Sequence, residues 1–172
     1  SLEEVRQTAE KLHAFLPLEE NLSVLYEPLT LAGKTAENRI AFQPMEGTDG
    51  TEDGAPDELT VRRYERFAKA GPGVEAVATV REGRASAHQL YLSEKNVDEF
   101  KRLTERIREV SLKENGYVPL LIMQATNSGR YSKPLGRPEP LIAYRCPPLE
   151  EGLEQPFRVL TDDELRRYED AF

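Results

Sequence analysis

Cysteine is almost absent from this chain, since Cys146 is the only one in 172 residues. A single thiol excludes an internal disulfide framework and an all-cysteine metal site within the chain. No apolar run approaches the roughly 20 residues that a membrane helix needs. The first residues also lack the basic-then-apolar order of a secretory signal. These absences favour the reducing cytoplasm and no contact with a membrane.

A basic surface is missing as well, because the net charge is −8. This charge argues against a general nucleic-acid binder, which neutralises phosphates with lysine and arginine. No Gly-x-Gly-x-x-Gly follows any expected strand, and no Walker-type Gly-Lys-Ser/Thr occurs, so a dinucleotide-binding sheet or a nucleoside triphosphatase is disfavoured. The acidic loop 46–54 lacks the register of a calcium loop. We therefore expect no metal site.

Two residues with reactive side chains are assigned no chemistry. His13 lies beside the apolar stripe of the first expected helix, and no second ligand is near it in sequence. Cys146 has no adjacent histidine and precedes two prolines, so a buried or idle thiol is favoured over a nucleophile.

What is present is an alternation of strand-like and helix-like segments, long enough in total to bury one substantial core. A hairpin is expected around Gly33-Lys34, and a capping box at Thr161 and Glu164 opens the last helix. Asn96 with Glu99 is expected to cap the helix before it. The expected helices cover residues 2–16, 57–70, 96–114 and 162–172, the strands cover 40–45, 74–80 and 118–123, and a long loop covers 131–160.

The strand–helix order predicts an α/β fold with a parallel sheet. Three strands are few for a complete sheet with both faces covered, so we expect the opening part of a (β/α)8 TIM barrel, which normally needs about 250 residues. Residues 1–23 are expected to form a helical extension, and residues 24–172 a hairpin plus about three βα units.

The apolar run Val118–Met123 is short enough for a strand buried on both faces. Gln124 follows at its end, and a polar turn reaches Arg130. Because chemistry in α/β sheets lies at the carboxyl ends of strands, this layout favours the edge of a site. The alternative is an ordinary strand that leaves the core through a polar turn.

Ordered motifs over residues 24–172 resemble the old yellow enzyme family of FMN-dependent oxidoreductases. The similarity begins with LYEPLT at Leu25, NRI at Asn38 and Pro44-Met45. It continues through residues 57–71 to the end of the chain, where the matching motifs are EGR at 82–84, QATNSGR at 124–130 and LTDDEL at 160–165.

The resemblance implies a set of cofactor contacts. The backbone at Pro44 and Met45 lies against the flavin ring, with Glu46 standing where the family usually has Thr, Cys or Gly. Ala78 is the small second-strand residue that packs on the flavin, with Ala76 and Thr79 as alternatives. Gln124 hydrogen-bonds the pyrimidine side of the ring.

The resemblance also implies a substrate rim. Asn127 replaces the usual histidine, and Arg130 and Tyr131 lie beside it. The family's substrate-anchoring histidine pair, its tyrosine proton donor and its phosphate site belong to later strands, so the catalytic residues are unknown in this chain.

The implied activity is an NAD(P)H-dependent ene-reductase reaction. FMN takes hydride from NAD(P)H and passes it to the β-carbon of a small α,β-unsaturated carbonyl substrate. The chain is expected to be the N-terminal portion of such an enzyme and to cover its open sheet edges by homo-oligomerisation or by association with a C-terminal half. The alternative is a non-catalytic barrel fragment that binds a partner chain or small ligand without flavin.

Overall fold

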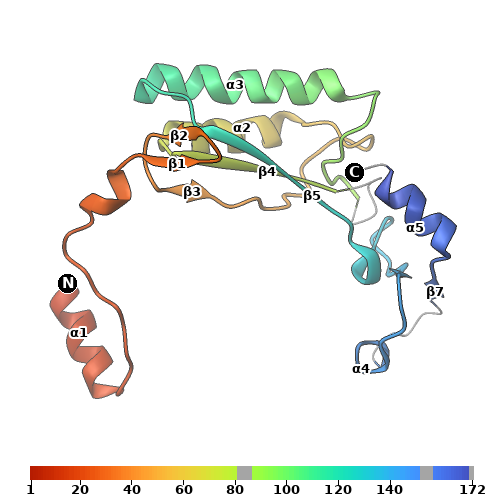
Figure 1. Ribbon diagram of the computed structural model, residues 1–172, viewed down its shortest axis with the longest axis horizontal. Coiled ribbons are helices and arrows are strands. Elements are labelled where there is room, and N and C mark those ends of the chain that lie inside the picture. The colour runs from red at the N-terminus through yellow and green to blue at the C-terminus, as the bar shows by residue number, and fades with distance from the viewer. Residues whose placement is uncertain (81–86, 152–156, 171–172) are drawn as a thin grey trace.

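The computed structural model describes residues 1–80, 87–151 and 157–170. Its centre is a parallel sheet of β3 (Ala41–Phe42), β4 (Val74–Val80) and β5 (Leu120–Thr126), in that order. Helices α2 (Glu58–Lys69) and α3 (Val97–Asn115) both lie on one face of this sheet, and no helix among the described residues covers the opposite face (Figure 1). The expected α/β fold is confirmed as an open βα arrangement, and no closed barrel forms among the described residues.

The hairpin at the start of the barrel segment is also confirmed. Strands β1 (Leu29–Leu31) and β2 (Lys34–Ala36) pair antiparallel across a two-residue turn. Ala32 and Gly33 have φ values of 46° and 75°, which suits a type I′ turn. The twist of such a turn matches that of the strands, and this keeps the hairpin in register.

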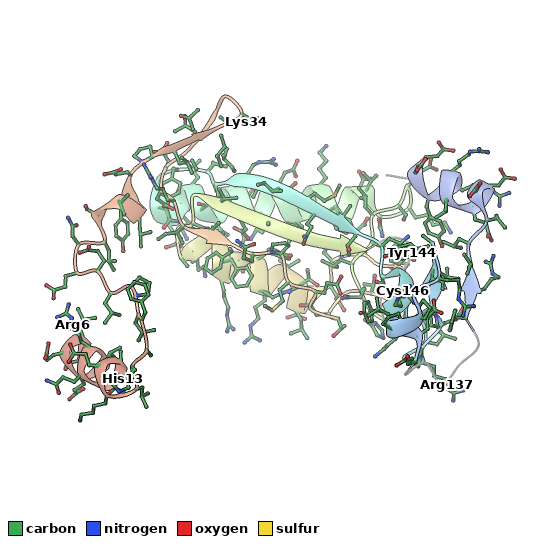
Figure 2. The ribbon with its side chains drawn as sticks, turned by 60° about the horizontal axis from the view of Figure 1, so that its bottom comes forward. Arg6, His13, Lys34, Arg137, Tyr144 and Cys146 are labelled. Atoms are coloured by element: carbon green, nitrogen blue, oxygen red, sulfur yellow. The ribbon has the colours of Figure 1, made fainter. Side chains whose placement is uncertain are left out.

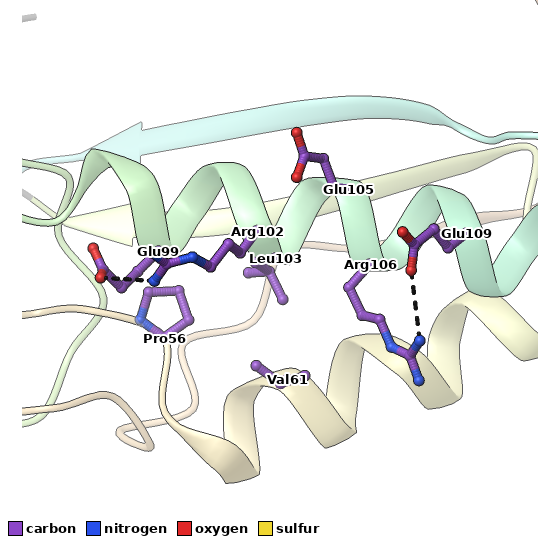
Figure 3. Close-up of a pocket in the computed structure, with 8 residues that line it drawn as sticks. All are labelled: Pro56, Val61, Glu99, Arg102, Leu103, Glu105, Arg106 and Glu109. Atoms are coloured by element: carbon purple, nitrogen blue, oxygen red, sulfur yellow. Dashed lines mark hydrogen bonds and ion pairs between the residues drawn. The ribbon is translucent and has the colours of Figure 1, made fainter.

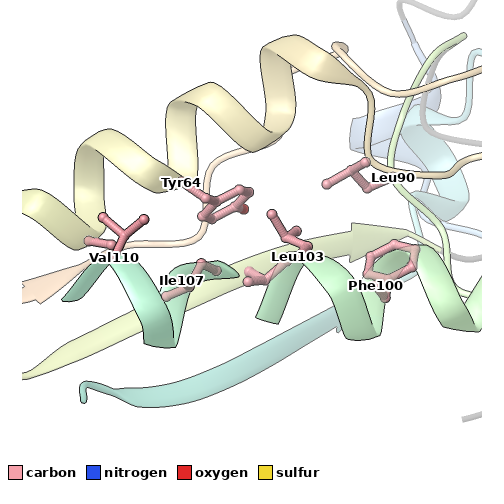
Figure 4. Packing of buried hydrophobic residues seen from close by; sticks show 8 residues of the cluster. Tyr64, Leu90, Phe100, Leu103, Ile107 and Val110 are labelled. Carbon is pink, nitrogen blue, oxygen red and sulfur yellow. The ribbon is translucent and has the colours of Figure 1, made fainter. Parts of the chain in front are cut away.

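The core lies between the two helices and the sheet. Tyr64 of α2 meets Leu103 and Ile107 of α3 (Figure 4), and Ala68 of α2 and Val77 of β4 belong to the same buried cluster. The spacing of Leu59, Tyr64, Phe67 and Ala68 predicts that these residues of α2 face inward, and this was wrong for Leu59, which is 61% exposed. The neighbouring Thr60 is fully buried instead. Thr60 is accommodated because its hydroxyl donates to the carbonyl of Asp49 at 2.8 Å.

Other boundaries differ from the sequence prediction for local reasons. Helix α1 (Leu2–Lys11) stops short of residue 16 because His13 adopts φ 51° and Ala14 N–H donates to the Ala9 carbonyl, a Schellman-type ending. Asn96 precedes α3 but does not cap it through its side chain. Its amide bonds instead to the backbone of Asp53, Tyr91 and Ser93.

The strand expected to be buried on both faces is an edge strand. Ile122 and Met123 of β5 are 48% and 56% exposed. Strand β5 pairs with β4 on one side, and no further strand pairs with it among the described residues. The predicted loop 131–160 also contains regular structure. It holds β6 (Leu141–Ile142) and α4 (Pro147–Glu150), and β6 pairs in parallel with β7 (Arg158–Val159) before α5 (Asp162–Glu169).

The remaining short elements are two 3₁₀ turns, Ser23–Tyr26 and Gly129–Tyr131. The capping box of α5 is confirmed, with Thr161 and Glu164 bonded reciprocally. Helix α1, which carries Arg6, lies apart from the sheet in both views (Figures 1 and 2). No helix in the described ranges has the length and apolar character needed to cross a membrane.

Asn38 ties the amino ends of the strands together. Its side-chain oxygen Oδ1 accepts from Ile40 N–H and Gly73 N–H at 3.0 and 2.7 Å. Its side-chain nitrogen Nδ2 donates to the Gly71 carbonyl and the Tyr117 hydroxyl at 2.8 and 2.9 Å. Gly73 must be glycine here, because a Cβ would clash with the backbone carbonyl oxygen of Asn38. The side chain thus links the starts of β3, β4 and β5.

Replacing Asn38 with alanine is expected to lower the free energy of unfolding by roughly 2–4 kcal/mol, because it leaves several buried polar groups without partners. Urea denaturation followed by circular dichroism measures this loss. Asn21→Ala is the matched control, since Asn21 caps an exposed turn, and it should change stability by less than about 0.5 kcal/mol. Equal effects of the two variants would contradict the role given to Asn38.

Glu75 is a fully buried carboxyl on β4, between Phe42 and Leu121 in the sheet register. Neither carboxylate oxygen has a hydrogen-bond partner among the described residues. Burial without a compensating charge raises the pKa of Glu75 to about 7. The folded protein therefore holds this side chain protonated below neutral pH.

The raised pKa of Glu75 predicts that the chain loses stability as pH rises from about 4.5 to 7. The unfolded chain releases this proton near pH 4.5, so the folded state is disfavoured by about 3 kcal/mol once pH exceeds 7. Denaturation at pH 5 and pH 8 measures the difference. The Glu75→Gln variant should show a smaller loss, and an unchanged pH slope would contradict the prediction.

Candidate functional site

The uncovered face of the sheet carries a hollow of about 370 Å³. Val74 and Ala76 of β4 form its floor, with Ile122 and Gln124 of β5 on one side. Its other lining residues come from the hairpin and from β3 and its flanks: Leu29, Leu31, Asn38, Arg39, Ala41, Phe42, Gln43 and Pro44. The surface of the hollow is mainly apolar.

Two of the five predicted cofactor contacts, Pro44 and Gln124, line this hollow at the carboxyl ends of β3 and β5. Ala78 lies next to Gln124, because these two residues pair in the β4–β5 register. Ala76, the sequence alternative to Ala78, forms part of the floor. The fold therefore brings together residues that are 80 positions apart in sequence.

Met45 and Glu46 follow Pro44 in the loop after β3. The Met45 side chain is 70% exposed, whereas its carbonyl oxygen accepts from Arg63 Nη1 at 2.8 Å. Glu46 Oε2 accepts from Gln89 Nε2 at 2.6 Å. Both residues are therefore tied to the body of the protein through α2 and the segment before α3.

The predicted substrate residues lie beyond β5. The Asn127 side-chain oxygen accepts from Gly129 N–H at 2.9 Å, and this bond shapes the turn. Tyr131 is 73% exposed. These two residues occupy the exit of β5 and do not line the hollow.

Arg130 is held by an ion pair instead of facing the hollow. Its Nη1 lies 3.5 Å from Glu150 Oε1, and Nη2 donates to the Tyr144 carbonyl at 3.2 Å. Burial alone would raise the pKa of Glu150, but the Cys146 N–H, Arg145 and Arg130 together lower it below its ordinary value. A substrate anion would have to displace this carboxylate to reach Arg130.

Tyr144 and Cys146 lie near each other in the same C-terminal part (Figure 2). Cys146 is half-buried and free, and its N–H donates to Glu150 at 2.6 Å. The EGR motif expected at 82–84 falls outside the described residues.

A second cavity, of about 460 Å³, lies between α2 and α3 on the outside of the layer (Figure 3). Its walls are salt-bridged: Arg106 lies 2.5 Å from Glu65 and 3.6 Å from Glu109, and Arg102 lies 3.1 Å from Glu99. The cations here are already neutralised, and none of the predicted site residues lines this cavity. The inner hollow is therefore the better candidate site.

Sequence reasoning missed Gln89 and Arg63 as residues of the site. Gln89 lies 43 positions after Glu46 in a polar stretch without periodicity. Arg63 is one of several arginines on α2. Neither residue carries a local signal, because their roles depend on contacts that only the fold creates.

Comparison with known proteins supports the fold. No protein-family model and no curated protein matches the sequence. Among solved structures, an old yellow enzyme from Pichia sp. AKU4542 is similar with a TM-score of 0.66 at 16% identity, covering 86% of this chain and 40% of that one. Morphinone reductase in complex with tetrahydroNAD gives 0.63 at 20% identity, covering 85% and 43%.

A 2-naphthoyl-CoA reductase complex gives a TM-score of 0.72 at 18% identity, covering 87% of this chain and 24% of that chain. This chain therefore spans between a quarter and somewhat over two fifths of these proteins. The resemblance to old yellow enzymes is confirmed for the fold, as an incomplete part of their TIM barrel.

Proposed function

We propose that this chain is the flavin-facing part of an FMN-dependent NAD(P)H oxidoreductase of the old yellow enzyme type. The observation that carries the proposal is the meeting of Pro44, Ala76 and Gln124 around one apolar hollow at the open face of the sheet. An apolar floor with an amide at its rim suits a planar ring whose edge carries hydrogen-bonding groups. The shared fold of old yellow enzymes is the second support.

The residues of the hollow fit the ring of FMN, but they offer little to its phosphate. Among the described residues, Arg39 is the only cation that lines the hollow, and it is paired with Glu27 at 3.1 Å. In TIM barrels the phosphate site commonly lies after strands seven and eight. We therefore assign only ring contacts to this chain: Pro44, Met45, Glu46, Ala78 and Gln124.

Bound FMN would supply hydride transfer from NAD(P)H to the β-carbon of an α,β-unsaturated carbonyl compound. The part of this chain is to bind and orient. The Gln124 amide holds the pyrimidine edge, and the backbone at Pro44 and Met45 closes one side of the ring. By the resemblance, Asn127, Arg130 and Tyr131 would contact a small-molecule substrate beyond the end of β5, although they do not line the hollow. The single free Cys146 agrees with a reducing cytoplasm.

The test of the flavin site is a titration of FMN with the purified chain, followed by absorbance and by quenching of flavin fluorescence. Near-stoichiometric binding is expected, and Gln124→Leu should weaken it by about tenfold or more, since a hydrogen bond to the ring is lost. Gln7→Leu, on the separate helix α1, is the control and should bind as the parent does. A parent chain that neither quenches the fluorescence of FMN nor retains FMN after desalting would contradict the proposal for this chain.

A second apolar surface, separate from the hollow, indicates that another segment packs against this chain. Beside the free edge of β5 lies an apolar groove of about 470 Å³, whose lining includes Val77, Phe100, Leu121 and Met123. An open edge and an uncovered apolar face are aggregation liabilities unless another segment covers them. We propose that a further βα unit covers them, from the rest of the barrel or from a second copy.

Because the apolar groove and the open edge of β5 need to be covered, we expect the isolated chain to self-associate. Light scattering coupled to size exclusion should give at least a dimer, and Met123→Glu should shift it toward monomer because the charge opposes burial. Glu151→Gln, at an exposed position away from the groove, is the control. A strictly monomeric parent chain at micromolar concentration would contradict the expectation.

The second candidate is a barrel part that binds a partner chain without flavin, and the same groove favours it. Reduction of an α,β-unsaturated carbonyl compound by NAD(P)H, measured after adding the remaining half of the barrel, separates the two functions. Activity with bound flavin supports the oxidoreductase, whereas assembly without flavin supports the alternative.

A further inference from the structure

One buried amide holds the loop that follows β3. Gln89 is only 4% exposed, and it reaches this loop from the segment before α3. Its Nε2 donates to Glu46 Oε2 at 2.6 Å, and its Oε1 accepts from Thr48 N–H at 3.0 Å. Both ends of a single side chain are therefore used on the segment 46–48.

A guanidinium holds the same loop from α2. Arg63 Nη1 donates to the Met45 carbonyl at 2.8 Å, and Nη2 donates to Asp49 Oδ1 at 2.9 Å. The planar fork of arginine fixes the direction of both bonds, which a lysine cannot do. Gly47 allows this approach, because a Cβ there would lie 2.6 Å from Nη2.

Further contacts fix the end of the loop. Asp49 accepts from the Thr60 hydroxyl through its carbonyl at 2.8 Å and through Oδ1 at 3.0 Å. Gly50 N–H donates to the His88 carbonyl at 2.8 Å. The segment 45–50 is thus tied to α2 on one side and to residues 88–89 on the other.

These ties matter because a loop that orders on binding a ligand loses about 1–2 kcal/mol per residue in backbone entropy. A loop that is already ordered avoids this loss at the moment of binding. Met45 and Glu46 are the residues whose backbone the proposed function places beside the flavin ring. Arg63 and Gln89 bond to this loop, and neither residue lines the hollow.

We propose that Gln89 and Arg63 are positioning residues that hold the Pro44–Glu46 backbone in place for the isoalloxazine ring of FMN. The inference rests on the proposed function, because it takes FMN as the ligand. It adds two residues that do not touch the cofactor and act through the loop.

The test uses the full chain with Gln89→Leu, Arg63→Met and Arg63→Lys. In Gln89→Leu and Arg63→Met, amide hydrogen exchange measured without FMN should accelerate by about tenfold or more in residues 44–50. Exchange in α3 should stay unchanged. FMN titration should show at least tenfold weaker binding and an altered flavin spectrum. Arg63→Lys should fall between Arg63→Met and the parent, because it keeps the charge without the fork.

Matched controls are Arg66→Met, at an exposed position one turn further along α2, and Gln7→Leu on α1. Both should leave exchange in residues 44–50 and FMN affinity as in the parent. A general loss of fold in Gln89→Leu would appear as faster exchange in α3, and Arg63→Lys then carries the test.

The outcomes separate the two proposals. If exchange in residues 44–50 is unchanged in the variants, the positioning role is overturned whatever FMN does. If the parent binds FMN and the variants bind it with the same affinity and spectrum, the positioning role is overturned and the proposed function stands. If exchange accelerates but the parent binds no FMN, the loop restraint is real, and the proposed function fails together with its flavin role.

Discussion

The amide of Asn38 is the contact on which the arrangement of the sheet depends. It bonds to the backbone before β3 and β4 and to the hydroxyl of Tyr117, just before β5. Three parallel strands whose connections are whole helices have no tight turns to align them. A buried side chain with four partners at their common end supplies that alignment, and Gly73 makes room for it.

The two faces of the sheet follow from this alignment. On one face Val77 and Leu121 meet the apolar stripes of α2 and α3, and the core forms there. On the other face small and apolar side chains such as Val74, Ala76 and Ile122 are left without a covering layer. In a closed barrel this second face points inward, so the hollow and the free edge of β5 are the expected consequences of an incomplete barrel.

At the carboxyl end of the sheet, polar side chains hold the loops in place. Gln89 and Arg63 bond to the loop after β3, while Arg130 and Glu150 join the exit of β5 to α4. Loops that shape sites on TIM barrels need such restraint, since their own sequences are polar and lack a core. Arg130 is likewise paired with Glu150 in the described structure, although its motif suggested a group at the rim.

The sequence by itself determined the elements whose signals are local. The helix predicted near residues 96–114, the β4 segment Val74–Val80, the hairpin turn at Gly33 and the capping box at Thr161 depend on neighbours within a few residues, and the structure has all four. The ordered motifs also indicated a part of an old yellow enzyme barrel, and the fold agrees with them.

Only the tertiary structure decided the features that depend on distant residues. Thr60 is buried and Leu59 is not, because Asp49 offers the hydroxyl a partner from 11 positions away. Glu75 is enclosed without a hydrogen-bond partner among the described residues, and Gln89 reaches a loop 43 positions before it. Such contacts leave no periodicity or spacing in the chain, since they arise only when the sheet brings separate segments side by side.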